Sequence, residues 1–138
     1  MEKVATVVLN YNSANDCRKC VEYLTKQKYP ENSIIVVDNA SSAPGENDEL
    51  ALIKEQFNVT LIKNKKNAGF SAGNNIGLRC AVNSVGADWC LIINPDVEIK
   101  NPDYIERVIQ ESRRWEGAVV IGTDIILPSG RHQNPIAE

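Results

Sequence analysis

The sequence predicts an α/β protein with three layers, α/β/α, around a mostly parallel central sheet. Short apolar runs alternate with amphipathic segments along the 138 residues, which is typical of parallel strands covered by helices on both faces. Three of these runs stop at polar turns, and open α/β sheets bind their ligands beyond the carboxyl ends of such strands. The runs and turns are Val7–Leu9 with Asn10–Asn12, Ile34–Val37 with Asp38–Asn39, and Leu91–Ile93 with Asn94–Asp96.

Each element is assigned from its own local pattern. Strands are expected where β-branched residues and leucine run together without charge, and helices where apolar residues recur every three or four positions. Ser13 is the expected N-cap of the first helix, with Asp16 three residues later as a variant capping box, and Asn101 with Pro102 begins the last helix. In chain order, we expect strand Val4–Leu9, helix Ala14–Lys26, strand Ile34–Val37, helix Asp48–Phe57, strand Val59–Ile62, a helix from the glycine-studded Asn67–Gly77 to Ser84, strand Ala87–Ile93, a helix from Pro102 to Trp115, and a last strand or bent pair at Ala118–Ile121 and Thr123–Leu127.

The composition is ordinary for a globular protein, with 43% hydrophobic and 24% charged residues. We expect residues 1–138 to form a single domain with its own apolar core. The net charge of −3 argues against nucleic-acid binding, which needs a basic face. Met1–Lys3 runs straight into a strand without a signal-peptide apolar region, and no apolar stretch approaches the ~20 residues that span a bilayer. We therefore expect a cytoplasmic protein.

Cys17 and Cys20 form a C-x-x-C sequence, a spacing that also occurs in redox pairs and zinc sites. However, Cys17, Cys20, Val21 and Leu24 occupy the i, i+3, i+4 and i+7 positions of one helical stripe. The sequence has no second C-x-x-C or paired histidine to complete four metal ligands. We therefore interpret both cysteines as packing residues, since a free thiol behaves as a small hydrophobic group.

Asp38 ends the second predicted strand, where a carboxylate can accept hydrogen bonds from a ribose or from a base N–H. In dinucleotide-binding folds such an acid accompanies a G-x-G-x-x-G turn after the first strand. The first turn here, Asn10–Ala14, contains no glycine, which disfavours dinucleotide binding. Tyr11 in this turn is suited to lie against a base or its ribose. The alternative is a tyrosine that only closes the end of the strand.

Gly69, Gly73 and Gly77 recur every four residues and so share one side of a helix and its entry turn. Glycine costs a helix up to ~1 kcal/mol relative to alanine, so three on one stripe require a reason. One reason is close packing of the helix on the sheet. The other is the approach of backbone N–H groups to an anion at the helix N-terminus. We expect Gly69 nearer to a ligand and Gly77 nearer to the core.

Asp96 follows a buried strand at the edge where a ligand would bind. A departing diphosphate needs its charge neutralised, and a divalent ion held by one or two carboxylates and by phosphate oxygens does this. At ~4 Å and an effective dielectric near 20, each pair of unit charges contributes about 4 kcal/mol before desolvation. The alternative is an aspartate that only caps a turn.

Taken together, four linked segments resemble the family 2 glycosyltransferases, most closely the rhamnosyltransferase-like branch. Their order and spacing match across nearly the whole chain, which is far more specific than any single motif. The segments are Val7–Asn12, Val36–Ser41, Asn67–Asn75 and Leu91–Val97.

The resemblance implies the nucleotide-diphospho-sugar transferase (GT-A) type of fold and a sugar-nucleotide donor used with Mg²⁺ or Mn²⁺. It implies that Tyr11 packs on the base, that Asp38 binds base or ribose, and that the turn Asn67–Gly69 closes over the nucleotide. Asp96 would be the metal-binding last position of the family's Asp-x-Asp motif. The nucleotide-binding residues expected on this basis are Asn10, Tyr11, Asn12, Asp38, Asn67, Gly69 and Asn94.

Two features depart from the family's pattern. The first position of the Asp-x-Asp motif is Asn94, which removes one charge near the metal and the ribose. The family's catalytic base is an Asp or Glu in the acceptor-binding half, and we expect this chain to comprise the donor-binding half alone, with the catalytic residues unassigned. The mechanism implied is a single inverting displacement, in which a carboxylate deprotonates the acceptor hydroxyl while the metal-held diphosphate departs on the opposite side.

By the same resemblance, a nucleotide-diphosphate sugar donor serves a glycan or lipid-linked acceptor in polysaccharide biosynthesis, at the inner face of the membrane. We expect self-association through the face left by the missing half. The alternative is a catalytically inert, truncated nucleotide- or protein-binding module. A nucleotidyltransferase is disfavoured, because it needs a glycine-rich basic loop where Asn10–Ala14 stands. His132, the single histidine, is expected on the surface without a partner.

Overall fold

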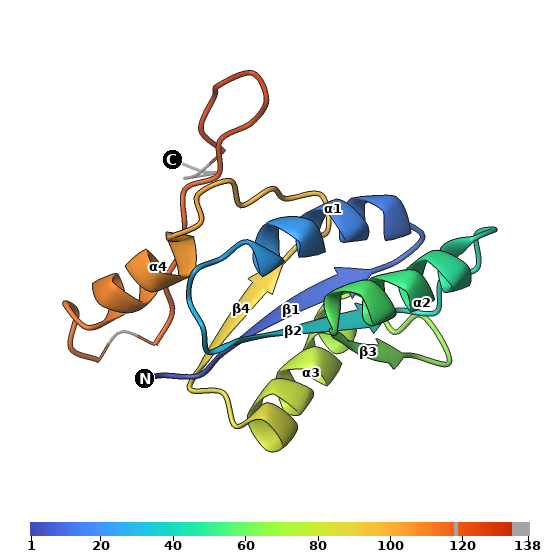
Figure 1. Ribbon diagram of the computed structural model, residues 1–138, viewed down its shortest axis with the longest axis horizontal. Coiled ribbons are helices and arrows are strands. Elements are labelled where there is room, and N and C mark those ends of the chain that lie inside the picture. The colour runs from blue at the N-terminus through green and yellow to red at the C-terminus, as the bar shows by residue number, and fades with distance from the viewer. Residues whose placement is uncertain (118, 134–138) are drawn as a thin grey trace. The chain divides into compact units, whose positions relative to one another are not determined.

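The computed structural model describes residues 1–117 and 119–133, which fall into two compact units divided after Ile105. The first unit holds a four-stranded parallel sheet of order β3-β2-β1-β4 (Figure 1). In the described part of the chain, no helix has the length and apolar character that crossing a bilayer requires. The elements are β1 Val4–Asn10, α1 Ala14–Thr25, β2 Asn32–Asp38, α2 Glu46–Phe57, β3 Thr60–Lys63, α3 Phe70–Cys80, a π-helical turn Ala81–Val85, β4 Trp89–Ile93 and α4 Tyr104–Ser112.

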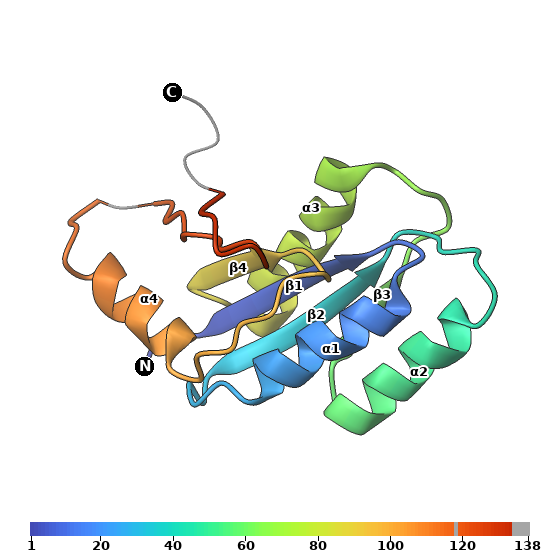
Figure 2. The same cartoon turned by 90° about the horizontal axis from the view of Figure 1, so that it is seen from above.

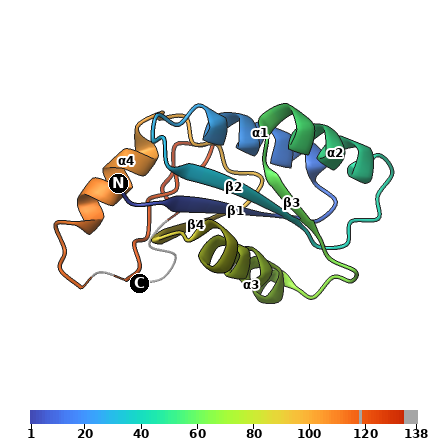
Figure 3. The same ribbon diagram turned by 60° about the horizontal axis from the view of Figure 1, so that its bottom comes forward.

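The strand order explains the three layers. From β1 the chain moves outward to β2 and β3, with α1 and α2 on one face of the sheet, and then returns through α3 on the other face to β4 (Figures 2 and 3). The direction of the strand order therefore reverses between β1 and β4. In open α/β sheets such a switch point, at the carboxyl ends of the strands, is where ligands bind. The predicted three-layer α/β/α class is confirmed.

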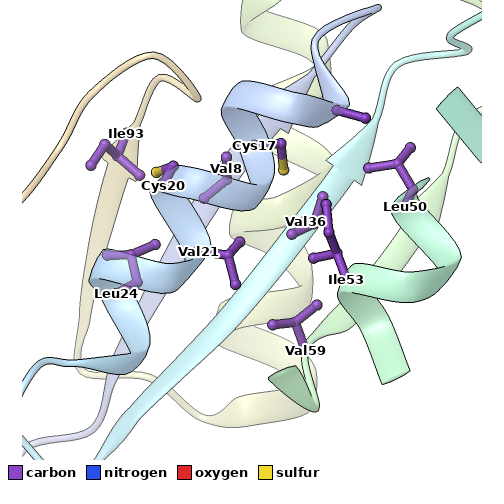
Figure 4. Packing of buried hydrophobic residues seen from close by; sticks show 11 residues of the cluster. Val8, Cys17, Cys20, Val21, Leu24, Val36, Leu50, Ile53, Val59 and Ile93 are labelled. Atoms are coloured by element: carbon purple, nitrogen blue, oxygen red, sulfur yellow. The ribbon is translucent and has the colours of Figure 1, made fainter. Parts of the chain in front are cut away.

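The pleat of the strands sorts their side chains between the two faces. Val8 and Val36 pack with the inner sides of α1 and α2 (Figure 4), whereas Val7 and Val37 belong to the apolar cluster on the α3 side. The predicted stripe on α1 is confirmed as buried along its whole length: Cys17, Cys20, Val21 and Leu24.

Two glycines let α3 lie directly on the sheet. A Cβ at Gly77 would collide with a side-chain methyl of Val7 and lie 3.1 Å from one of Val37. A Cβ at Gly73 would lie 2.6 Å from a methyl of Leu9. Gly69, at the N-cap of α3, has a φ of +85° and open space around its Cα, so there glycine serves backbone conformation rather than packing. The expectation that Gly77 lies nearer to the core is confirmed.

The start of α1 differs from the predicted capping pattern. Ser13 occupies the N-cap position, but its hydroxyl donates to Asn10 Oδ1 (3.0 Å) and makes no capping bond. The N–H of Ala14 donates instead to the carboxylate of Glu46, at 3.0 and 3.2 Å. Ser13 is therefore the N-cap residue, as predicted, but the predicted capping box is not formed. The carboxylate of another helix, which the positive end of the helix dipole favours, accepts the first N–H instead.

Some boundaries also differ from the predicted ones. Asn101 Oδ1 accepts the N–H of Asp103 (2.9 Å) in a turn, and α4 begins only at Tyr104 and ends at Ser112. A side chain that bonds its own backbone two residues on competes with helix formation, which delays the start of the helix. The helix predicted to end at Ser84 is α-helical to Cys80 and then π-helical.

The strands predicted near the end of the chain are not formed in residues 119–127, of which one residue makes an isolated bridge. Val119 and Val120 are 85% and 84% exposed. Ala118, the first residue of the predicted pair, lies outside the described residues. The prediction is wrong for the described positions because an apolar run becomes a strand only where a neighbouring strand accepts and donates its backbone hydrogen bonds.

The second unit contains a tight turn that places a histidine beside an aspartate. Leu127 N donates to Arg131 O (2.8 Å), and Ile126 and His132 form the antiparallel bridge. His132 is exposed, as expected, but it is not without a partner, because its Nδ1 lies 2.5 Å from Asp124 Oδ2. Exposed pairs of this kind contribute little to stability.

We expect Gly77→Ala to lower the free energy of unfolding by about 1–2 kcal/mol, because overpacking outweighs the gain in helix propensity. The obstructing methyl of Val7 is attached to Cβ and cannot rotate away cheaply. Gly73→Ala should cost less, because Leu9 meets the added carbon with the far end of a flexible side chain. Urea denaturation of both variants, with exposed Ser71→Ala as control, measures the difference, and equal losses at Gly73 and Gly77 would contradict it.

Candidate functional site

The carboxyl ends of β1, β2 and β4 bring the predicted polar residues to one edge of the sheet. Asn10 and Asp38 are register partners at the ends of β1 and β2. Val8 pairs with Ile93 across β1 and β4, so Asn94 leaves the sheet beside the end of β1. The site predicted from three separate strand ends is therefore a continuous edge at the switch point of the sheet.

The pleat also decides which face each of these side chains serves. Asn10 and Asp38 are an even number of residues from Val8 and Val36 and lie on the face covered by α1 and α2. Asn39 follows Asp38 directly and turns to the opposite face, where its side chain lies beside α3. Two adjacent residues at the end of β2 thus contact different parts of the protein, Asp38 on the α1–α2 side and Asn39 on the α3 side.

On the α1–α2 side, a hydrogen-bonded cluster surrounds the amide of Asn10. Asn10 Nδ2 lies 3.1 Å from Ser41 Oγ, 3.1 Å from Glu46 Oε2 and 3.4 Å from Asp38 Oδ1. Asp38 Oδ1 also accepts from the backbone N–H (3.2 Å) and hydroxyl (2.5 Å) of Ser41. One carboxylate oxygen of Asp38 is therefore held by protein donors, and its other oxygen carries none of these bonds.

On the α3 side, Asn39 ties the loop after β3 to the end of β2. Its Nδ2 donates to Asn67 Oδ1 (2.9 Å) and Gly69 O (3.2 Å), and its Oδ1 accepts from Asn64 Nδ2 (3.0 Å) and Ala68 N (3.3 Å). Asn39 is buried and its side chain uses both donors and both lone pairs. The loop that we expect to close over a nucleotide is thus held by hydrogen bonds within the protein.

Asn12 braces the turn that carries Tyr11. Its φ is +52°, its backbone N–H donates to Ser41 Oγ (2.8 Å), and its Oδ1 accepts from the N–H groups of Ser42 (2.8 Å) and Ala43 (3.0 Å). Tyr11 is 49% exposed just after the end of β1. The turn after β1 and the loop after β2 are therefore one braced unit that presents an aromatic ring to solvent.

Asn94 and Asp96 lie in an exposed turn that folds back beside α1. Val97 N donates to Asn94 O (3.2 Å), and the thiol of Cys20 lies 3.8 Å from the same oxygen. Burial, and then the charge of Asp96, raise the pKa of Cys20 to about 12. For Cys17 the pKa is raised to about 12 by burial and then by Cys20, Glu46 and Asp38.

The side chains at this edge could bind a divalent ion only if substrate phosphates or water supplied further oxygen ligands. Among residues 1–117 and 119–133, no group of three or more His, Cys, Asp or Glu side chains is arranged to hold a metal ion. Asp96 offers a carboxylate and Asn94 an amide, both exposed. Mg²⁺ and Mn²⁺ are commonly bound by one or two carboxylates together with substrate phosphates and water, and this set is compatible with that arrangement.

Two hollows in the described surface lie away from this edge. One, of about 200 Å³, is lined by residues that include Lys3 and Glu31, and the other, of about 440 Å³, by residues that include Tyr29 and Phe57. Both touch Asn32, at the amino end of β2. Neither contains a predicted site residue, and their place in the fold does not favour them, because parallel sheets bind ligands at the carboxyl edge.

Three residues of the edge were not among the predicted site residues, namely Asn39, Ser41 and Glu46. Asn39 and Ser41 lie in the segment Val36–Ser41 that carries the family resemblance. Their place in this motif is the sequence feature from which they could have been predicted as site residues. Glu46 is one of three acids in the first turn of α2, and no local pattern distinguishes it from the other two. Of the predicted residues, Asn10 is fully buried, so its amide orients its neighbours, and its contact with a nucleotide stays a prediction.

Solved structures that this chain resembles define the class of fold. The mannosyltransferase PcManGT of Pyrobaculum calidifontis, in complex with GDP-Man and Mn²⁺, matches with a TM-score of 0.72 and 21% identity over 88% of this chain and 34% of that chain. Residues 1–349 of S. aureus TarS, in complex with UDP-GlcNAc, match with a TM-score of 0.65 and 19% identity over 87% and 37%. The fold is that of the GT-A glycosyltransferases.

The sequence profile described as Glycosyl transferase family 2 matches residues 6–136, and the chain belongs to that family. The hexosyltransferase Agl10 of low-salt glycan biosynthesis in Haloferax volcanii is 27% identical over 106 residues, which cover 77% of this chain and 32% of Agl10. The glycosyltransferase GlyG of Streptococcus pneumoniae is 26% identical over 121 residues, covering 88% and 38%. This chain thus spans about a third of the length of these relatives.

We expect Asn39→Asp to destabilise the protein by about 2–4 kcal/mol, because the isosteric carboxylate loses two buried donors and faces two acceptors instead. Asn75→Asp, on the exposed side of α3, is the matched control. Chemical denaturation measures the loss of stability, and amide exchange around Gly69 measures the release of the loop. A variant as stable as Asn75→Asp would contradict the role assigned to Asn39.

We expect Cys17 and Cys20 to resist alkylation in the folded protein at pH 8 and to react on unfolding, because burial raises their pKa from the usual 9.0 to about 12. Below pH 9 both states keep these protons, so the two thiols add no pH dependence. As the pH rises from 9 towards 12, only the unfolded state loses them and stability falls. Iodoacetamide labelling with peptide mass mapping tests this, and labelling of either thiol in the folded chain contradicts it.

Proposed function

We propose that this chain is the donor-binding part of a glycosyltransferase that moves a sugar from a nucleotide-diphosphate donor to a hydroxyl acceptor. One observation carries the proposal: the ends of β1, β2 and β4 place Tyr11, Asp38 and Asp96 along one edge at the switch point of a family 2 chain. An aromatic ring, a held carboxylate and an exposed carboxylate match the base, the ribose and the metal-bound diphosphate of such a donor.

In this assignment the nucleoside lies against the turn after β1 and the end of β2. Tyr11 packs on the base, and the unheld oxygen of Asp38 accepts a hydrogen bond from the base or the ribose. The braced turn Asn67–Gly69 borders the nucleotide from the α3 side. Asn10 and Asn12 act mainly through the shape of the edge, because the first is buried and the second already uses its side-chain oxygen twice.

At the other end of the donor, Asp96 would hold Mg²⁺ or Mn²⁺ and Asn94 would bind the ribose or the ion through its amide oxygen. The ion, when bound, neutralises the diphosphate as it leaves. The complexes of PcManGT with GDP-Man and Mn²⁺ and of TarS with UDP-GlcNAc support the donor class and, for the former, the metal. Asn94 in place of a second aspartate leaves this edge with one negative charge fewer than an Asp-x-Asp motif.

The reaction proposed is a single displacement with inversion at the anomeric carbon. A carboxylate base deprotonates the acceptor hydroxyl, which attacks from the side opposite to the departing diphosphate. We place the base outside this chain, in an acceptor-binding part. Agl10, a hexosyltransferase of glycan biosynthesis by its name, supports hexosyl transfer in such a pathway. Rhamnosyl transfer, a glycan or lipid-linked acceptor and action at the inner face of the membrane are parts of the proposal that no relative supports directly. Self-association of the chain, through the face that an acceptor-binding part would cover, stays a prediction.

The test is calorimetric titration of UDP, dTDP and GDP into this chain, with Mn²⁺ and with EDTA. We expect one diphosphate to bind in a metal-dependent manner and Asp96→Ala to weaken that binding about tenfold or more, the range in which disturbed metal sites lose affinity. Asp88→Ala, at the other end of β4, is the matched control. Binding that survives EDTA and Asp96→Ala would contradict the metal role, and no binding to any diphosphate would leave the inert protein-binding module as the better account.

A further inference from the structure

We propose that Glu46 is a positioning residue of the nucleotide site: its buried carboxylate holds the turn after β1, and through it Asn10 and Tyr11, in the geometry that binds the donor. Glu46 does not itself touch the ligand in this account. The inference rests on the proposed function, because it assigns Glu46 a part in donor binding at the same edge.

The carboxylate of Glu46 joins three elements that are far apart in the sequence. It belongs to the first residue of α2 and is 9% exposed. Both of its oxygens accept the N–H of Ala14, the first residue of α1, at 3.0 and 3.2 Å. Oε2 also accepts Nδ2 of Asn10, the last residue of β1, at 3.1 Å. These bonds bracket the turn Tyr11–Ser13 from both sides.

The turn depends on this distant acid because it has no sufficient local cap. The first N–H groups of a helix have no partner within the helix and need acceptors from outside. Ser13, at the position where a hydroxyl usually does this, donates to Asn10 Oδ1 instead (3.0 Å). A carboxylate is the acceptor that the positive end of the helix favours most, and Glu46 provides it.

The same carboxylate is one of three acceptors that orient the amide of Asn10. Nδ2 has two hydrogens, and Glu46, Ser41 and Asp38 offer it acceptors on one side, while Oδ1 receives the Ser13 hydroxyl. With this orientation, Nδ2 faces the same oxygen of Asp38 that Ser41 holds. If Glu46 lost its acceptor oxygen, the amide of Asn10 could rotate, and Asp38 and the Tyr11 turn would lose a fixed neighbour.

The alternative is that Glu46 only stabilises the contact between α1 and α2. Glu49 offers a matched comparison, because it lies three residues further along α2 and its carboxylate pairs with Arg18 of α1. Glu49 thus joins the same two helices through a partly buried side chain, and this ion pair does not reach Asn10 or the Tyr11 turn. If Glu46 had a purely structural role, replacing either glutamate would change the affinity for the diphosphate by a similar factor, after correction for any difference in stability.

The test compares Glu46→Gln with Glu49→Gln. Glutamine at 46 keeps the shape and one acceptor for Ala14, but it sets an amide NH₂ against that of Asn10. Each variant is titrated with the diphosphate and Mn²⁺ that the unmodified chain binds, at a temperature where circular dichroism shows it folded. We expect Glu46→Gln to weaken binding about tenfold, as for the loss of one charge-assisted hydrogen bond in a buried site, and Glu49→Gln to bind like the unmodified chain.

A second variant keeps the test decisive if Glu46→Gln does not fold. Glu46→Asp retains the charge on a shorter side chain and should also weaken binding, with amide exchange at Ala14 faster than in Glu49→Gln. Unchanged affinity in a folded Glu46 variant, or equal losses at Glu46 and Glu49, would overturn the positioning role while leaving the proposed function intact. Absence of binding by the unmodified chain would overturn the proposed function, and the positioning role with it.

Discussion

The geometry of the whole edge depends on the pleat at the end of β2, which sends two neighbouring polar side chains to opposite faces of the sheet. Asp38 turns towards α1 and α2 and joins Asn10 and Ser41. Asn39 turns towards α3 and holds the loop that contains Gly69. A shift of register by one residue would exchange the two faces, and the amide of Asn39 would stand where the carboxylate of Asp38 now bonds Asn10 and Ser41.

Among the described residues, the hydrogen bonds to the buried acids at this edge come from N–H and O–H donors and not from basic side chains. Asp38 is held by Ser41 and Asn10, and Glu46 by Ala14 N–H and Asn10. Buried charges are costly unless their oxygens are satisfied, and charge-assisted bonds to N–H and O–H groups are strong and directional. Such a network orders the loops by bonds within the protein, and loops that are already ordered lower the entropic cost of binding.

Local sequence patterns were sufficient for most of the first unit. The uncharged runs around Val8 and Val36 predict buried parallel strands, and the spacing of Cys17 and Cys20 predicts packing rather than metal binding, because burial imposes a period that can be read from neighbouring residues. The same reasoning failed at residues 119–127. An apolar run there has the composition of a strand, but strand formation depends on a partner strand that the run itself cannot specify.

The sequence by itself determined the class of fold, the strand ends at which Tyr11, Asp38 and Asp96 stand, and the family, because short-range periodicity and linked motifs carry that information. Only the tertiary structure decided that Glu46 caps α1, that Ser41 holds Asp38 and that Asn39 ties down the loop before Gly69. Except for Ser41 and Asp38, these bonds join residues about thirty positions apart. No local propensity encodes such pairs, since they form only when the pleat and the strand order bring the ends of β1 and β2 together.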